Sequence, residues 1–263
     1  MKATVSTSSK FGSNTQNDIS RKIFELETAI QSYGIQLECR NDFTVFRETA
    51  KKITDLAELT GVFDDQVSEI GPENGFWIQG KNQYGEVVHR QAIRHDDLAG
   101  TSLANHWITN PQVHAPAGYD IDIEESDFNT APVADTITGS VCYHGEFWLD
   151  LPYRKMEVAS FLSRYCILLG LLQFSPNVIY GTMPPKLIER GWSVRAGYLH
   201  IHPWAPRWRI RGKSKYYDEY LVWISSSELV NLWTADERDI DVLGRINFRN
   251  YDGGTTTEHV TGQ

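Results

Sequence analysis

The stretch Gly145–Ala159 is the part of the sequence whose residue types and order most clearly suggest a binding site. An apolar, strand-like run ends at Leu149, a short turn containing Pro152 follows, and a helical pattern begins near Lys155. The first backbone N–H groups of a helix have no partner within the helix, and the helix dipole adds partial positive charge at the same end. A turn that leads directly from a strand into a helix therefore predicts a site for an anion such as a phosphate.

Two titratable residues on the preceding strand, His144 and Glu146, are candidates for acid–base chemistry. Because side chains alternate along a strand, residues two positions apart are expected to point to the same face. A base on that face would remove the proton from an incoming ammonium group, with the second residue orienting it. The alternative is a solvent-facing pair or a structural ion pair, since both also occur on strands.

The same stretch resembles the GNAT superfamily of acyl-CoA N-acyltransferases. In that family the central strand commonly ends in a pattern like Val-Asp-Pro-x-Tyr-Arg, and the next helix opens with Arg/Gln-x-x-Gly-x-Gly/Ala, whose backbone amides hold the CoA pyrophosphate. Residues 149–154 match the first pattern loosely, and Arg154 and Ala159 match the second. Glu157 stands where the family has Gly, and its charge would repel a phosphate unless Lys155 offsets it.

The resemblance implies a fold, a co-substrate and a set of site residues. It implies an α/β (α+β mixed) chain with a central mixed, mostly antiparallel sheet and helices on both faces, using acetyl-CoA or another acyl-CoA as co-substrate. The strand over 178–183 would splay away from the strand over 139–149 and open a slot for pantetheine. Glu146 and His144 become the candidate catalytic residues, and the candidate CoA-binding residues are Phe147 and Leu149, through their main chain, with Arg154, Lys155, Met156, Glu157, Val158 and Ala159.

One family feature does not carry over to this sequence. Family members often place a Tyr, the general acid, four residues before the Gly of a Gly-Phe-like pair. Gly197-Tyr198 matches the pair, but Ser193 occupies the Tyr position. Three hypotheses follow: an acyl-CoA-dependent N-acyltransferase that transfers an acetyl or longer acyl group to an amine, a non-catalytic GNAT-like module that binds a protein or small ligand, and an unrelated α/β enzyme.

Histidines and basic residues in the last third of the chain offer two further candidate sites. His200 and His202 share a strand face, but no third ligand follows at a zinc-binding spacing, so we expect no metal site. Trp204, Trp208 and the basic residues of 207–215 would either clamp an anionic substrate, such as the 3′-phosphate of CoA, or form a solvated loop.

Acidic residues dominate the charge of the chain. The formal net charge of −9 disfavours a nucleic-acid partner, because phosphate binding needs a positive surface. The acidic group Glu124, Glu125 and Asp127 would either attract an amine to the rim of a cleft or form a solvated acidic loop. We therefore expect a small-molecule amine acceptor, while the oligomeric state is left open.

Hydrophobic periodicity and turn residues predict the elements that position these residues. We expect a disordered leader over 1–18, a single domain over 19–250 with a long loop near 110–136, and a flexible tail over 251–263. No run is apolar enough for a secretory signal or a membrane span, which predicts a cytoplasmic protein. The expected helices cover 18–33, 47–59, 96–107, 155–172 and 186–196, and the expected strands 43–46, 75–79, 87–94, 139–149, 178–183, 199–202 and 220–224.

Overall fold

A computed structural model describes residues 11–53, 59–129, 131–154 and 156–234, and its centre is a seven-stranded sheet. The strand order is β1–β2–β3–β5–β6–β10–β7, and every neighbouring pair is antiparallel except β5 and β6. The strands are β1 (Gln36–Arg40), β2 (Gly75–Lys81), β3 (Val87–Leu98), β5 (Gly139–Leu149), β6 (Val178–Met183), β7 (His200–His202) and β10 (Tyr220–Ser225). The predicted mixed, mostly antiparallel α/β architecture is confirmed.

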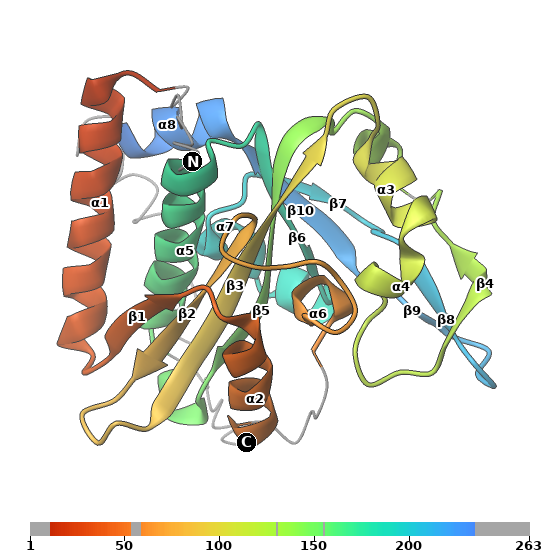
Figure 1. Ribbon diagram of the computed structural model, residues 1–263, viewed down its shortest axis with the longest axis horizontal. Coiled ribbons are helices and arrows are strands. Elements are labelled where there is room, and N and C mark those ends of the chain that lie inside the picture. The colour runs from red at the N-terminus through yellow and green to blue at the C-terminus, as the bar shows by residue number, and fades with distance from the viewer. Residues whose placement is uncertain (1–10, 54–58, 130, 155, 235–263) are drawn as a thin grey trace, which may run out of the picture.

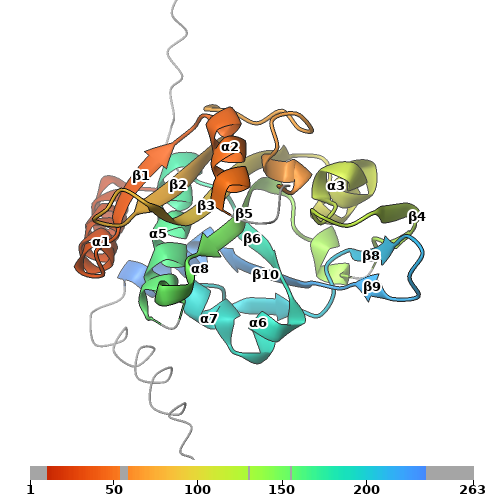
Figure 2. The ribbon, with the colours of Figure 1, turned by 90° about the horizontal axis from the view of Figure 1, so that it is seen from below.

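Helices cover both faces of this sheet (Figures 1 and 2). On one face lie α1 (Ser13–Ser32), α5 (Val158–Phe174) and α8 (Ser226–Thr234); on the other lie α2 (Phe43–Ile53) and α3 (Leu103–Thr109). The buried residues of α1 recur at helical spacing and pack against α5. The core on the α2 side is built largely from aromatic rings, namely Phe43, Phe46, Phe63, Trp77, Trp107, Tyr143 and Tyr180.

A smaller three-stranded sheet stands beside the large one, at the right of Figure 1. It consists of β4 (Ile121–Asp127), β8 (Arg207–Ile210) and β9 (Tyr216–Tyr217). The long loop predicted near 110–136 is wrong, because this segment contains α4 (Pro111–His114), β4 and the 3-10 turn η2 (Pro132–Asp135). The basic segment is a solvated loop only in its second part, because Arg207–Ile210 form the strand that pairs with β4, whereas residues 211–215 are exposed and lie outside helices and strands.

In several places the predicted elements differ from the structure. The strand predicted over 43–46 is the first turn of α2, because Phe43 and Phe46 lie one helical turn apart and both rings pack on Phe63. The helix predicted over 186–196 is two short helices, α6 (Pro185–Glu189) and α7 (Trp192–Ala196), separated by Gly191 at φ 67°. The predicted leader is wrong over 13–18, which belongs to α1, and the predicted tail lies outside the described residues.

The two parallel strands β5 and β6 pair only at their beginnings. Val141, Cys142 and Tyr143 stand opposite Val178, Ile179 and Tyr180, and no further pairs follow between the described strands. Beyond this point β6 stays paired with β10 along its whole length, while β5 follows β3 and contains a β-bulge. At the bulge two residues, Glu146 and Phe147, stand opposite Gln91, and Glu146 adopts φ 55°. The splay expected from the resemblance to the GNAT superfamily is therefore confirmed.

None of the helices in the described part of the chain combines the length and the apolar character that crossing a membrane requires.

Candidate functional site

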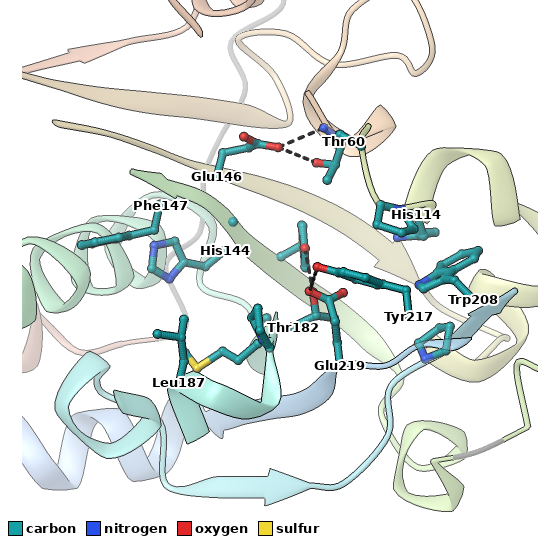
Figure 3. Close-up of a pocket in the computed structure, with 18 of the residues that line it drawn as sticks. Thr60, His114, His144, Glu146, Phe147, Thr182, Leu187, Trp208, Tyr217 and Glu219 are labelled. Atoms are coloured by element: carbon teal, nitrogen blue, oxygen red, sulfur yellow. Dashed lines mark hydrogen bonds between the residues drawn. The ribbon is translucent and has the colours of Figure 1, made fainter. Parts of the chain in front are cut away.

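A cavity of about 350 Å³ opens where β5 and β6 separate (Figure 3). Its floor is formed by β5 from Tyr143 to Phe147 and by β6 from Gly181 to Met183. The opposite wall comes from the small sheet and from α3 and α4, through Trp107, His114, Trp208 and Tyr217. The cavity therefore lies between the large sheet and the segments inserted after β3 and after β7.

Glu146 lies at one end of the cavity and is held by an ion pair. Its Oε2 atom is 2.7 Å from Nη1 of Arg90, and its Oε1 atom accepts hydrogen bonds of 2.9 Å from both the backbone N–H and the hydroxyl of Thr60. The side chains of Glu146 and Arg90 are only 10% and 6% exposed. Both oxygens of this carboxylate therefore have partners, and Arg90 supplies its counter-charge.

His144 points to the opposite face of the sheet from Glu146. Arg90 and Gln91 are neighbours on β3 and face opposite sides; Glu146 contacts Arg90, whereas His144 contacts Gln91. The prediction that His144 and Glu146 share a face is therefore wrong, because the bulge at Glu146 reverses the alternation of side chains.

Both ring nitrogens of His144 take part in a buried network. Gln91 Nε2 donates to the Leu162 carbonyl at 2.7 Å, so Gln91 Oε1 accepts from His144 Nε2 at 2.9 Å. The Tyr198 hydroxyl then donates to His144 Nδ1 at 2.8 Å. Burial lowers the pKa of His144 to about 4, which makes the imidazole neutral at physiological pH. In this arrangement His144 fixes the position of the Tyr198 hydroxyl, which also lines the cavity.

Glu219 lies at the other end of the cavity, and the sequence analysis did not identify it. It precedes β10, and its carboxylate accepts hydrogen bonds from the hydroxyls of Thr182 and Tyr217, the latter at 3.4 Å (Figure 3). Burial raises the pKa of Glu219 to about 7, because these two hydroxyls only partly replace the lost water. A carboxylate with that pKa releases and accepts protons near neutral pH. In the sequence, the only indication of this site was an isolated Glu close to the tyrosines at 216, 217 and 220.

Three phenol groups line the same cavity and remain protonated at neutral pH. Burial raises the pKa of Tyr143, Tyr198 and Tyr217 above that of an exposed tyrosine. The Tyr143 hydroxyl is 3.3 Å from the hydroxyl of Thr182, which also contacts Glu219. The cavity thus brings together a carboxylate that accepts protons and hydroxyls that donate them.

Most of the predicted CoA-binding residues lie at the start of α5, away from the cavity. Of those that the structure describes, only Phe147 lines it, and Lys155 lies outside the described residues. Nε of Arg154 donates to the Leu149 carbonyl at 2.6 Å, so this carbonyl already has a partner. Glu157 is the N-cap of α5 with φ −63° and ψ −25°, ordinary values for any L-residue, and it is exposed.

The remaining N-terminal residues of α5 differ in burial. Met156 is 45% exposed, whereas Val158 and Ala159 are buried beneath the turn. The backbone conformation at Glu157 does not require Gly, and the carboxylate can extend into solvent, where its repulsion of an anion is screened.

Of the acidic group noted in the sequence, Asp127 stands opposite Arg207 in the pairing of β4 with β8, while Arg211 contacts two other acidic residues. Arg211 contacts Asp120 at 3.4 Å and Asp122 at 3.1 Å, across the pair formed by β4 and β8. Arg207 pairs with Asp218 at 2.7 Å. Glu124 and Glu125 are exposed on β4 and do not line the cavity.

The histidines of β7 have separate partners. His200 Nε2 lies 2.6 Å from a carboxylate oxygen of Glu228, and His202 Nδ1 lies 3.4 Å from the Trp204 carbonyl. Within the described ranges, no three His, Cys, Asp or Glu side chains are grouped so that they could hold a metal ion.

No protein-family model matches the chain, and no curated protein matches it in sequence. Among solved structures, the chain is similar to Arabidopsis thaliana NAA60 in complex with acetyl-CoA, with 11% identity, a TM-score of 0.44, and coverage of 73% of this chain and 98% of that one. It is also similar to the spermidine/spermine N-acetyltransferase SpeG from Vibrio cholerae in complex with manganese ions, with 8% identity, a TM-score of 0.46, and coverage of 76% and 98%.

Proposed function

We propose that this protein is an acyl-CoA-dependent N-acyltransferase that transfers an acetyl or longer acyl group to an amine. The observation that supports this most strongly is the cavity at the separation of β5 and β6, which contains a carboxylate with a pKa of about 7 and several protonated phenols. Acyl transfer to an amine needs a base for the ammonium proton and a donor for the leaving thiolate.

Glu219 is the base in this proposal. It takes a proton from the ammonium group, and the free amine nitrogen then attacks the thioester carbonyl carbon. The new C–N bond forms, the C–S bond breaks, and the thiolate leaves with a proton from a phenol of the cavity. The phenolate then takes the second proton of the former amine nitrogen, which restores the phenol and leaves a neutral amide. Tyr143 is the candidate donor, because its hydroxyl lies at the cavity wall, whereas the Tyr198 hydroxyl donates its proton to His144. Glu146 and His144, the residues first predicted for catalysis, already have partners that occupy their polar atoms.

The acyl-CoA would approach from the side where β5 leaves β6. In the proposal the main chain of Phe147 pairs with pantetheine, and the N-terminus of α5, over 154–159, binds the pyrophosphate. The dipole of the 17-residue helix α5 supports this role through the partial positive charge at its start. The N–H groups of Arg154 and Met156 already donate to the carbonyls of Leu151 and Tyr153, so a phosphate would bind to other N–H groups of this stretch. Pairing at Leu149 would first require Arg154 to release the carbonyl that it now contacts.

The test is release of free CoA, followed with a thiol reagent, from acetyl-CoA and from a long-chain acyl-CoA in the presence of a panel of amines. In parallel, thermal melting measures binding, since a ligand at 100 times its dissociation constant stabilises the fold by about 2.7 kcal/mol. Turnover with any amine supports the proposal. Stabilisation without turnover would instead identify a non-catalytic acyl-CoA-binding module. If acyl-CoA neither stabilises the fold nor releases CoA, the cavity has no role in binding CoA.

A further inference from the structure

The charges around the cavity do not balance. Among the lining residues that the structure describes, the charged side chains are the carboxylates of Glu146 and Glu219, and none is Lys or Arg. Arg90 neutralises Glu146 through the 2.7 Å ion pair. Arg207, next to the lining residue Trp208, is matched by Asp218. Glu219 receives only hydroxyl hydrogen bonds, so one negative charge in the cavity has no cationic partner from the described chain.

Aromatic rings surround this unbalanced carboxylate. Trp107 comes from α3 and lines the cavity together with Tyr143. Trp208 from β8 and Tyr217 from β9 line it as well (Figure 3). Trp107 and Trp208 are 1% and 2% exposed, which fixes their rings in place. The faces of aromatic rings attract cations, and their bodies bind apolar groups.

His114 adds an uncharged ring to the wall of the cavity. Burial holds the pKa of His114 well below its usual value, so the ring is neutral at physiological pH. Apart from the paired Glu146, the described lining of the cavity therefore provides a single negative charge among uncharged rings.

We infer that the acceptor is a small primary amine that carries one positive charge, has an aromatic or compact apolar body, and has no carboxylate. This inference rests on the proposed function and names its substrate class. The ammonium group supplies the positive counter-charge that the carboxylate of Glu219 lacks, and the aromatic rings enclose the body of the amine. A free amino acid would bring its carboxylate to a cavity whose described lining contains no Lys or Arg, and a polyamine would bury charges that find no second free carboxylate.

The test compares four matched ligands by calorimetry with the wild-type protein and without acyl-CoA. Phenethylamine has one charge and one ring; phenylalanine adds a carboxylate; 2-phenylethanol removes the charge; and spermidine has several charges and no ring. We expect phenethylamine to bind at least tenfold more tightly than each of the other three. Equal or tighter binding of phenylalanine or spermidine, or no binding of phenethylamine, would overturn the inference.

Matched variants connect the binding to Glu219. Glu219→Gln should weaken phenethylamine binding about tenfold or more and leave the affinity for 2-phenylethanol unchanged. Glu125→Gln removes the same charge from an exposed position on β4 and should change neither affinity. An unchanged affinity for phenethylamine in Glu219→Gln would show that this carboxylate does not recognise the amine.

Measurements of CoA release distinguish a failure of this inference from a failure of the proposed function. If CoA is released faster with phenylalanine or spermidine than with phenethylamine, the protein is a transferase and the inferred acceptor class is wrong. If phenethylamine binds through Glu219 but no acyl-CoA releases CoA, the cavity is an amine-binding site and the transferase proposal is wrong.

Discussion

The cavity has a carboxylate at each end, and the two have different surroundings. At the Thr60 end, Glu146 is held by Arg90 and by two hydrogen bonds from one residue. At the Tyr217 end, Glu219 is held by hydroxyls alone and has a pKa raised to about 7 by burial. A buried carboxylate with a full set of partners supports the fold, whereas one that lacks a counter-charge costs stability and remains reactive. We therefore propose a structural role for Glu146 and a catalytic role for Glu219.

The largest expected effect is on activity at the Tyr217 end. Glu219→Gln keeps the shape of the side chain and removes its capacity to accept a proton, so kcat/KM for the amine should fall by on the order of 10²–10³-fold. Affinity for acyl-CoA, measured by thermal stabilisation, should stay the same. If Glu146→Gln instead produces the larger loss of kcat/KM and Glu219→Gln is nearly as active as wild type, the roles of the two ends are reversed.

The next largest effect is on stability at the Thr60 end. Arg90→Met leaves the buried carboxylate of Glu146 without its counter-charge, so the free energy of unfolding in urea should decrease by about 3 kcal/mol. The double variant Arg90→Met/Glu146→Gln should recover most of this loss, because no uncompensated charge remains. A double variant as unstable as Arg90→Met alone would show that Arg90 acts through packing, for example on the ring of Phe46, and not through the pair.

The difference in unfolding free energy between Glu219→Gln and wild type should depend on pH. The pKa of Glu219 is raised from its ordinary value of 4.5 to about 7, so between these values the folded state holds more protons than the unfolded state. The contribution of Glu219 to stability is therefore complete below pH 4.5 and is lost as the pH rises through about 7. Relative to wild type, Glu219→Gln should become more stable over this window, by about 1–3 kcal/mol at pH 8.

Urea unfolding of wild type and Glu219→Gln at pH 4.5, 6 and 8 measures this difference. The activity of the wild type should rise with pH over the same window, since the base must be ionised to accept a proton. A stability difference that does not change with pH would show that Glu219 ionises at its ordinary pKa and has no raised affinity for a proton.

The sequence predicted the large sheet better than it predicted the site. The hairpin of β2 and β3, the central strand β5 and the strand β6 were predicted because each is a run of β-forming residues bounded by turn residues. The bulge at Glu146 leaves no mark on such a pattern, since a single extra residue changes which face a side chain occupies without changing composition. The shared face predicted for His144 and Glu146 failed for this reason.

Glu219 was missed because its properties come from residues far away in the chain. Thr182 contacts it only because β6 pairs with β10, which places Thr182 opposite Leu221. The pairing of β4 with β8 was not predicted either, although the acidic group at 124–127 and the basic segment at 207–215 were both noted. These opposite charges could have predicted that the two segments pair as strands. That pairing forms part of one wall of the cavity, close to Glu219.

The smallest expected effect concerns the N-terminus of α5, outside both ends of the cavity. Glu157 is exposed and already has helical backbone angles, so Glu157→Gly should tighten acyl-CoA binding only a few-fold, by removing a like charge near the pyrophosphate. The gain should vanish at high salt because screening removes the repulsion. Arg154→Ala should weaken binding under the same conditions, because it removes a positive charge near the phosphates. Calorimetric titration of acetyl-CoA at low and high ionic strength measures both changes. If neither substitution alters the affinity at either salt concentration, no phosphate is bound at this turn, and an acyl-CoA that still binds must place its phosphates elsewhere on the protein.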